Sequence, residues 1–158
     1  MKTIYLDNNA TTRVAPEVLA EMTPYFSELY GNPSSMHSFG GQVSKQLVEA
    51  REKTASLIGA DPDEIIFTSC GTESDNTAIY SALAASPDKR HIITSRVEHP
   101  AVKVLCEHLA EKDYRITTLD VDNSGMIDMD QYKKSLSADT AVVSMMCANN
   151  ETGVIFPV

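Results

Sequence analysis

The sequence has no tryptophan, and its three cysteines, Cys70, Cys106 and Cys147, are far apart and form no Cys-x-x-Cys pair. Cysteines so few and scattered suggest neither a disulfide framework nor a cysteine zinc site, and they indicate reduced thiols. Apolar runs such as residues 141–148 are too short to span a bilayer, and the first residues lack the pattern of a signal peptide. A cytoplasmic protein with no membrane partner is therefore expected.

Positive charge is also scarce. The chain has 13 basic and 22 acidic residues, a formal net charge of -9 and no basic cluster. This composition argues against a nucleic-acid partner, so any bound phosphate has to be held by local groups. With 158 residues, 42% of them apolar and 22% charged, the chain has the composition of a globular protein of one domain or most of one.

Hydrophobic periodicity predicts an α/β fold. Apolar residues recur at helical spacing over residues 43–58, and Gly59 supplies a stop. Residues 61–64 predict a single turn that leads into a buried strand at 65–69. Beyond it, helices are expected at 73–85, 100–112 and 128–136, and strands at His91–Ser95, 114–119 and 140–148. This alternation predicts helices covering a mostly parallel sheet, preceded by an arm of loops around one short helix at 1–42.

The strongest local signal is at residues 67–76, where the predicted strand passes through Gly71 into a helix. Gly71 allows close approach to the backbone, and the first N–H groups of the helix, with the Thr72 hydroxyl, suit a phosphate. Alternatively, Thr72 is only an N-cap with Asp75 three residues later. Glu73 and Asp75 also add negative charge near that site, so both interpretations stay open on the residues alone.

Two further motifs follow predicted strands. His99 lies in the run Glu-His-Pro-Ala-Val at 98–102, and Asn149 and Asn150 open the run at 149–153. Taken singly, His99 is a helix cap and the second run is a turn. The carboxyl ends of parallel strands meet at one edge, where ligands bind. A phosphate pocket, an imidazole and a carboxamide at that edge predict a site for a phosphorylated, planar cofactor.

A calcium loop competes for residues 120–128. Oxygen-bearing side chains stand at the first, third, fifth and ninth positions, and Gly125 stands at the sixth. The twelfth position is Gln131 instead of glutamate, and the preceding segment alternates like a strand. A polar turn in which Gly125 takes a positive φ is therefore preferred, and no metal site is expected.

Five motifs, at residues 5–12, 31–37, 70–76, 98–102 and 149–153, together resemble those of cysteine desulfurases of the nitrogen-fixation (NifS) type, in the class V aminotransferase superfamily. The sequences at residues 68–72 and 155–157 resemble this type more than the housekeeping type of cysteine desulfurase. The resemblance implies a fold-type I pyridoxal-phosphate enzyme that is a homodimer at full length, with residues 43–158 as the amino-terminal part of its large domain.

The same resemblance implies roles for particular residues. Gly71 and Thr72 would hold the phosphate of pyridoxal 5'-phosphate, and His99 would stack on the pyridine ring as a catalytic residue. Asn150, chosen over Asn149 on alignment, would hydrogen-bond near the ring hydroxyl and the substrate carboxylate. Family members convert L-cysteine to L-alanine and pass the sulfur through a cysteine persulfide to iron–sulfur cluster assembly, which implies an iron–sulfur scaffold protein as acceptor.

In the family, the lysine that binds the cofactor covalently and the persulfide cysteine lie later in the chain than Asn150. No lysine or cysteine of this sequence stands in a matching context. The chain is thus expected to be an amino-terminal fragment, inactive and poorly soluble alone. Two alternatives stay open: another enzyme of the superfamily, such as a selenocysteine lyase or an aminotransferase, or a non-catalytic cofactor-binding fragment.

Overall fold

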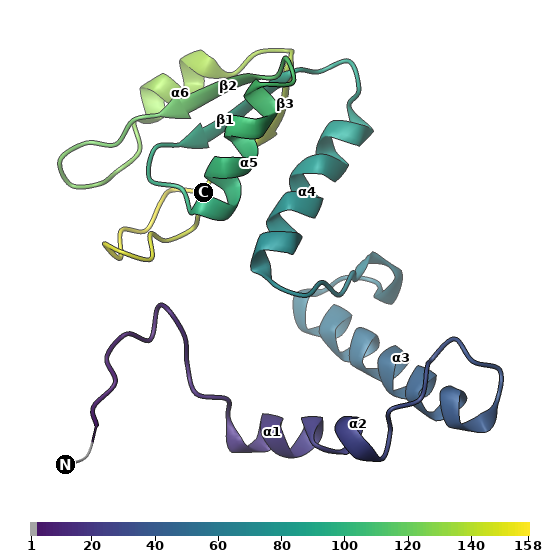
Figure 1. Cartoon of the computed structure of the whole chain (residues 1–158). Coiled ribbons are helices and arrows are strands. Elements are labelled where there is room, and N and C mark those ends of the chain that lie inside the picture. Colours follow the sequence, from purple (N-terminus) through teal and green to yellow (C-terminus); the bar gives the residue numbers. More distant parts are fainter. Residues whose placement is uncertain (1–2) are drawn as a thin grey trace. The chain divides into compact units, whose positions relative to one another are not determined.

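A computed structural model describes residues 3–158 and divides at Phe67 and Thr68 into two compact units (Figure 1). Each unit is described by itself. The division into an arm at 1–42 and a large-domain part at 43–158 refers to the fold of the family and stays a prediction.

The first unit is helical. Two short helices, α1 (Pro16–Met22) and α2 (Pro24–Ser27), each begin with a proline, where one short helix was predicted. The long helix α3 (Ser38–Ile58) begins five residues earlier than the 43–58 periodicity predicts, because His37 caps it. The His37 Nδ1 accepts the N–H of Gly40 at 3.1 Å. The helix ends as predicted at Gly59, which takes the left-handed conformation with φ 70°.

The predicted turn at residues 61–64 is confirmed as the short 3-10 helix η1 (Pro62–Glu64), closed by a capping box between Asp61 and Glu64. The strand predicted at 65–69 is wrong. Ile65 is buried and its carbonyl accepts a hydrogen bond from the Arg51 guanidinium, but no strand in residues 3–158 pairs with this segment. The backbone N–H and C=O groups of a strand need hydrogen-bond partners on an adjacent strand, and an apolar run in the sequence does not show whether such a strand exists.

The second unit contains a parallel sheet of three strands in the order β2-β1-β3. The strands are β1 (His91–Ser95), β2 (Arg115–Leu119) and β3 (Thr140–Val143), and the helices are α4 (Gly71–Ala85), α5 (Pro100–Ala110) and α6 (Met129–Ser135). The prediction of helices covering a mostly parallel sheet is confirmed, and β1 has its predicted bounds. β3 ends at Val143 instead of residue 148, because the chain then folds back through a bridge between Ala148 and Ile155.

Both faces of β1 are covered, as Figure 1 shows. Ile92 packs with Leu83 of α4 and Leu105 of α5 in one apolar cluster. Ile93, the next residue, points to the opposite face and packs with Leu119 and Phe156 in a second cluster, against which α6 also lies. The core of this unit therefore has two layers, and β1 is buried from end to end.

His91, at the start of β1, connects all three strands and is fully buried. Its Nδ1 lies 2.8 Å from the Thr140 hydroxyl of β3, and its Nε2 lies 2.8 Å from the Thr117 hydroxyl of β2. A neutral imidazole donates through one nitrogen and accepts through the other, so it satisfies both hydroxyls. Burial, and then the charge of Arg115, lower the pKa of His91 and keep the ring neutral.

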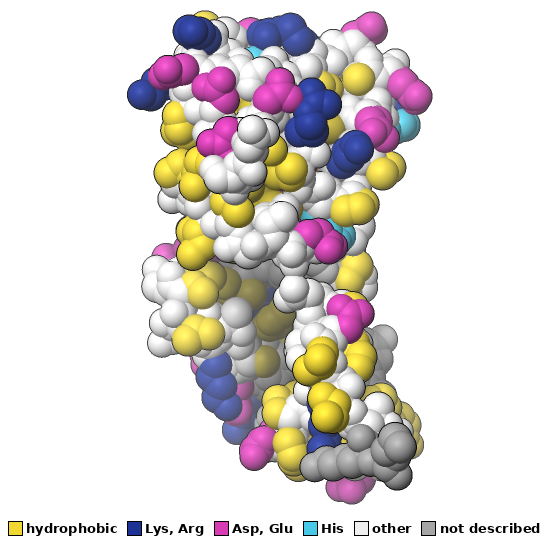
Figure 2. All heavy atoms as spheres, turned by 90° about the vertical axis from the view of Figure 1, so that its left-hand side faces the viewer, with side chains coloured by type: hydrophobic (Ala, Val, Ile, Leu, Met, Phe, Trp, Pro, Cys, Tyr) yellow, Lys and Arg dark blue, Asp and Glu magenta, His cyan; other side chains and the backbone are white. Residues whose placement is uncertain are grey.

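The surface carries charges of both signs. On the face shown in Figure 2, the lysine and arginine side chains in the upper part stand among aspartate and glutamate, with hydrophobic side chains between them. Among residues 3–158, no helix has both the length and the apolar character needed to cross a bilayer.

We predict that His91 makes stability depend on pH. Below about pH 6.5 the imidazole of the unfolded chain binds a proton, whereas the folded imidazole, with its lowered pKa, stays neutral. The contribution of His91 to the free energy of unfolding is therefore fully present above that pH and decreases below it. The urea midpoint of the chain should therefore fall between about pH 7.5 and about pH 5.5. His91→Gln should lower the free energy of unfolding at the higher pH by about 1–2 kcal/mol and reduce this fall.

His108→Gln is the matched control, since His108 is exposed on α5. Equal pH dependence in the chain and in His91→Gln would contradict the role given to His91.

Candidate functional site

The amino terminus of α4 is organised by the residues just before it. Cys70 is the N-cap, so Thr72 is not the cap and the capping interpretation of Thr72 is wrong. The Ser69 N–H and hydroxyl both donate to one Glu73 carboxylate oxygen at 2.6 Å, and these bonds lower the pKa of Glu73. The negative charge of Glu73 is therefore directed back at Ser69, which leaves the Thr72 hydroxyl available.

The Cys70 thiol lies where an anion is favoured. The Cys70 side chain makes no capping hydrogen bond to the helix. The pKa of its thiol is nevertheless lowered by the nearby backbone N–H of Glu73 and by the Ser69 hydroxyl, whose oxygen lies 3.7 Å from the sulfur. The first bond within the helix is from the Ser74 N–H to the Cys70 carbonyl at 3.1 Å. The N–H groups of the preceding residues thus point out of the helix end, as in anion sites.

His99 is both a cap and a pocket residue. Its Nδ1 accepts the N–H of Ala101 at 3.1 Å, so His99 is the N-cap of α5, as the simpler interpretation of the sequence held. This bond leaves Nε2 as the protonated nitrogen of the neutral ring. The Glu98 carboxylate fixes the loop, accepting the His99 N–H at 3.2 Å and the Met146 N–H, just beyond β3, at 3.0 Å.

Thr72 and His99 line one open pocket of about 490 Å³ between α4 and α5. Asn76, one turn after Thr72 on the same face of α4, lines it too, and its buried Oδ1 has no hydrogen-bond partner among residues 3–158. His108 of α5 completes the polar lining. The sequence did not predict a role for Asn76 or His108, although the spacing of Thr72 and Asn76 places them on one face of a helix and could have indicated the first.

Gly71 and Asn150 do not line this pocket. No atom lies within 4 Å of where a Cβ on Gly71 would stand, so the backbone there is open to a ligand. The strand predicted to bring Gly71 and Thr72 to the sheet edge is missing from residues 3–158. Packing of α4 on α5, through Leu83 and Leu105, places Thr72 near His99 instead.

The two adjacent asparagines differ in their surroundings. Asn149 is buried, its Oδ1 accepts the N–H groups of Glu151 and Thr152 at 3.0 and 2.8 Å, and its Nδ2 donates to the Val97 carbonyl. Asn150 is exposed and donates to the Glu151 carboxylate at 3.1 Å. Asn149 therefore holds the loop to the end of β1, and Asn150 is the amide that a ligand can reach.

Residues 120–128 form the predicted turn. Gly125 has φ 81°, and an isolated bridge joins Val121 and Ile127. One Asp122 carboxylate oxygen accepts the Ser124 hydroxyl and two N–H groups at 2.6 to 3.0 Å, which lowers the pKa of Asp122. Internal donors thus occupy the oxygen that the calcium interpretation assigned to a cation.

We predict that Cys70 is the most reactive cysteine. Its lowered pKa gives it more thiolate near neutral pH, whereas burial raises the pKa of Cys106 to about 11. Iodoacetamide, followed by peptide mass spectrometry, should modify Cys70 at least about twice as fast as the exposed Cys147, and Cys106 last. Ser69→Ala should slow Cys70 alone, and a Cys147 rate equal to that of Cys70 would contradict the account.

A family model described as Aminotransferase class-V matches residues 4–158. Cysteine desulfurase 2 of Trichormus variabilis is 59% identical over 158 residues, which are 100% of this chain and 40% of that protein. The chain thus spans about two fifths of the length of such a relative.

Solved structures give the same result. A NifS-like protein matches with a TM-score of 0.89 and 42% identity over 95% of this chain and 42% of its own. SspA in complex with cysteine matches with a TM-score of 0.88 and 34% identity over 98% of this chain and 45% of its own. The predicted resemblance and the α/β fold of a fold-type I enzyme are confirmed. The chain belongs to the class-V aminotransferase family.

Proposed function

We propose that the chain is the cofactor-binding part of a pyridoxal-phosphate-dependent cysteine desulfurase that converts L-cysteine to L-alanine and passes the sulfur to an enzyme cysteine. The observation that carries the proposal is the pocket in which Thr72 and His99 meet, with the unpartnered Asn76 oxygen between polar side chains of α4 and α5. The 59% identity with a cysteine desulfurase supports the choice of this reaction within the family.

The residues present fit a phosphorylated, planar cofactor, which members of this family use. The end of α4 supplies outward N–H groups and the Thr72 hydroxyl, and both favour a phosphate. The space beside Gly71 is open, so a phosphate can approach the backbone closely. Glu73, the nearest acid, is engaged by Ser69, so its repulsion of the phosphate is reduced.

Pyridoxal phosphate supplies an electron sink for bonds at the α-carbon of a bound amino acid. The chain supplies placement. Thr72 and the α4 terminus bind the phosphate, and Asn76 contributes an acceptor in the same pocket. The cap on Nδ1 fixes the His99 ring in the proposed stacking position, with Nε2 as a donor. Asn150, exposed next to the buried Asn149, is the amide proposed to bind the substrate carboxylate.

The remaining assignments belong to the same proposal. The substrate is L-cysteine, and a structural relative was solved with cysteine bound. The sulfur acceptor is an iron–sulfur scaffold protein, and the full-length form is a homodimer. The three free thiols support a reducing compartment, for which we propose the cytoplasm.

Thr72→Val should weaken the binding of pyridoxal phosphate to the chain about tenfold, because one hydrogen bond to a charged phosphate is lost. Absorbance titration measures the affinity. Thr118→Val, which changes an exposed threonine outside the pocket, is the matched control and should bind as the chain does. No lysine in the described part of the chain lines the pocket, so borohydride should leave no cofactor–lysine adduct. An adduct at a single lysine would contradict this.

The reaction is tested on the polypeptide expressed from the whole reading frame that encodes these residues. With L-cysteine it should form L-alanine and a cysteine persulfide, both measurable by mass spectrometry. His99→Ala should reduce this rate about a hundredfold, within the range for loss of a positioned catalytic side chain. Transfer of the amino group to a keto acid without release of sulfur would contradict the desulfurase assignment and favour an aminotransferase.

A further inference from the structure

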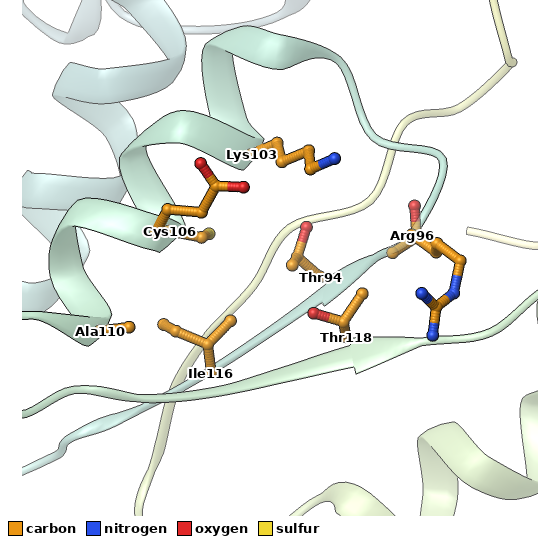
Figure 3. Close-up of a pocket in the computed structure, with 9 residues that line it drawn as sticks. Thr94, Arg96, Lys103, Cys106, Ala110, Ile116 and Thr118 are labelled. Carbon is orange, nitrogen blue, oxygen red and sulfur yellow. The ribbon is translucent and has the colours of Figure 1, made fainter.

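A second pocket lies on the other side of α5. It has a volume of about 390 Å³ and is bounded by α5, the carboxyl end of β1 and the length of β2. Figure 3 shows Thr94 and Thr118, from the two strands, with their side chains directed toward Lys103 and Cys106 of α5. This pocket shares no lining residue with the pocket of Thr72 and His99.

Thr94 gives this pocket its unusual feature. The residue is 4% exposed, and its hydroxyl has no hydrogen-bond partner among the described residues. Thr94 stands opposite Thr118 in the register of β1 and β2, on the face covered by α5, and Figure 3 shows its hydroxyl facing the pocket. Buried polar groups nearly always have a partner, so this hydroxyl calls for one from within the pocket, either a water or a ligand. The Ser95 hydroxyl, also unpartnered, belongs to the opposite face of the strand.

Of the three charged residues that line the pocket, one cation and one anion have no ion-pair partner among residues 3–158. Lys103 and Glu107 stand four residues apart on α5, a spacing that permits an ion pair, yet neither takes part in an ion pair within the described part of the chain. Arg96, at the end of β1, is already held by Asp120, with 2.6 Å between Nε and Oδ1. One cation and one anion thus remain for a ligand.

We propose that this pocket binds a small α-amino acid as its zwitterion. The ligand carboxylate binds the Thr94 hydroxyl and the Lys103 ammonium group, and the ligand ammonium group binds the Glu107 carboxylate. Cys106, Ala110 and Ile116 form an apolar floor with room for a short side chain. The inference stands on this pocket alone and does not rest on the proposed function.

Other classes of ligand leave one of these groups unsatisfied. A simple anion would be repelled by Glu107, and a simple cation would be repelled by Lys103. An apolar molecule would leave the Thr94 hydroxyl buried without a partner and would desolvate both charges. Only a ligand with both charges and a hydrogen-bond acceptor complements the whole lining.

The test is calorimetric titration of the chain with L-alanine, without pyridoxal phosphate. We expect saturable binding of one alanine with a dissociation constant on the order of 1 mM. Thr94→Val keeps the side-chain shape and should weaken binding at least about tenfold, because it removes the hydroxyl that binds the carboxylate. Acetate and ethylammonium, each carrying one of the two charges, should each bind at least about tenfold more weakly than alanine.

Two controls locate the site. Lys103→Met should weaken binding, whereas Lys112→Met, which removes an exposed lysine just after α5, should not. His108→Gln changes the lining of the other pocket without removing the cap of α5, and it should bind alanine as the chain does. Circular dichroism of each variant checks that the fold is kept. Absence of saturation, unchanged binding by Thr94→Val, loss of binding by His108→Gln, or acetate binding equal to that of alanine would each overturn the proposal.

Discussion

The burial of β1 between two parallel neighbours is the constraint on which the second unit depends. Because β1 pairs on both edges and is covered on both faces, its backbone groups bond to β2 and β3, and its buried polar side chains need partners away from bulk water. His91 meets this need at one end through two threonine hydroxyls. At the other end, Arg96 pairs with Asp120, and Glu98 accepts the Met146 N–H. The loops after all three strands are thereby tied together at one edge of the sheet.

This arrangement makes α5 the element that both pockets share. His99 caps the amino terminus of α5, and the Glu98 carboxylate holds the loop that positions His99. One face of the helix lines the pocket with Thr72, and the opposite face lines the pocket with Thr94. A buried stripe between them, which includes Leu105 and Leu109, holds the helix to the sheet and to α4. Any change that shifts α5 on β1 therefore alters both pockets at once.

The sequence correctly predicted the features that depend on hydrophobic periodicity and on neighbouring residues. β1, the helix stop at Gly59 and the turn at Gly125 follow from short patterns that need no distant partner. The strand at 65–69 and the end of β3 were wrong because a strand depends on pairing with residues far along the chain. The choice between Asn149 and Asn150 shows the same limit. Two identical side chains stand in one turn, and only burial against Val97 separates the structural amide from the accessible one.

The acidic composition of the chain disfavours a phosphate ligand on average, but net charge acts over the whole surface, and salt screens it within about 10 Å. Local groups decide instead. At the start of α4 the nearest acid is turned back on Ser69, and a thiol occupies the position in front of the first N–H groups. The same N–H groups that lower the pKa of Cys70 are the ones that a phosphate needs. A phosphate bound there would withdraw those donors from the sulfur and add negative charge beside it, and both effects raise the pKa of the thiol. The pKa of Cys70 should therefore rise when this helix end binds an anion.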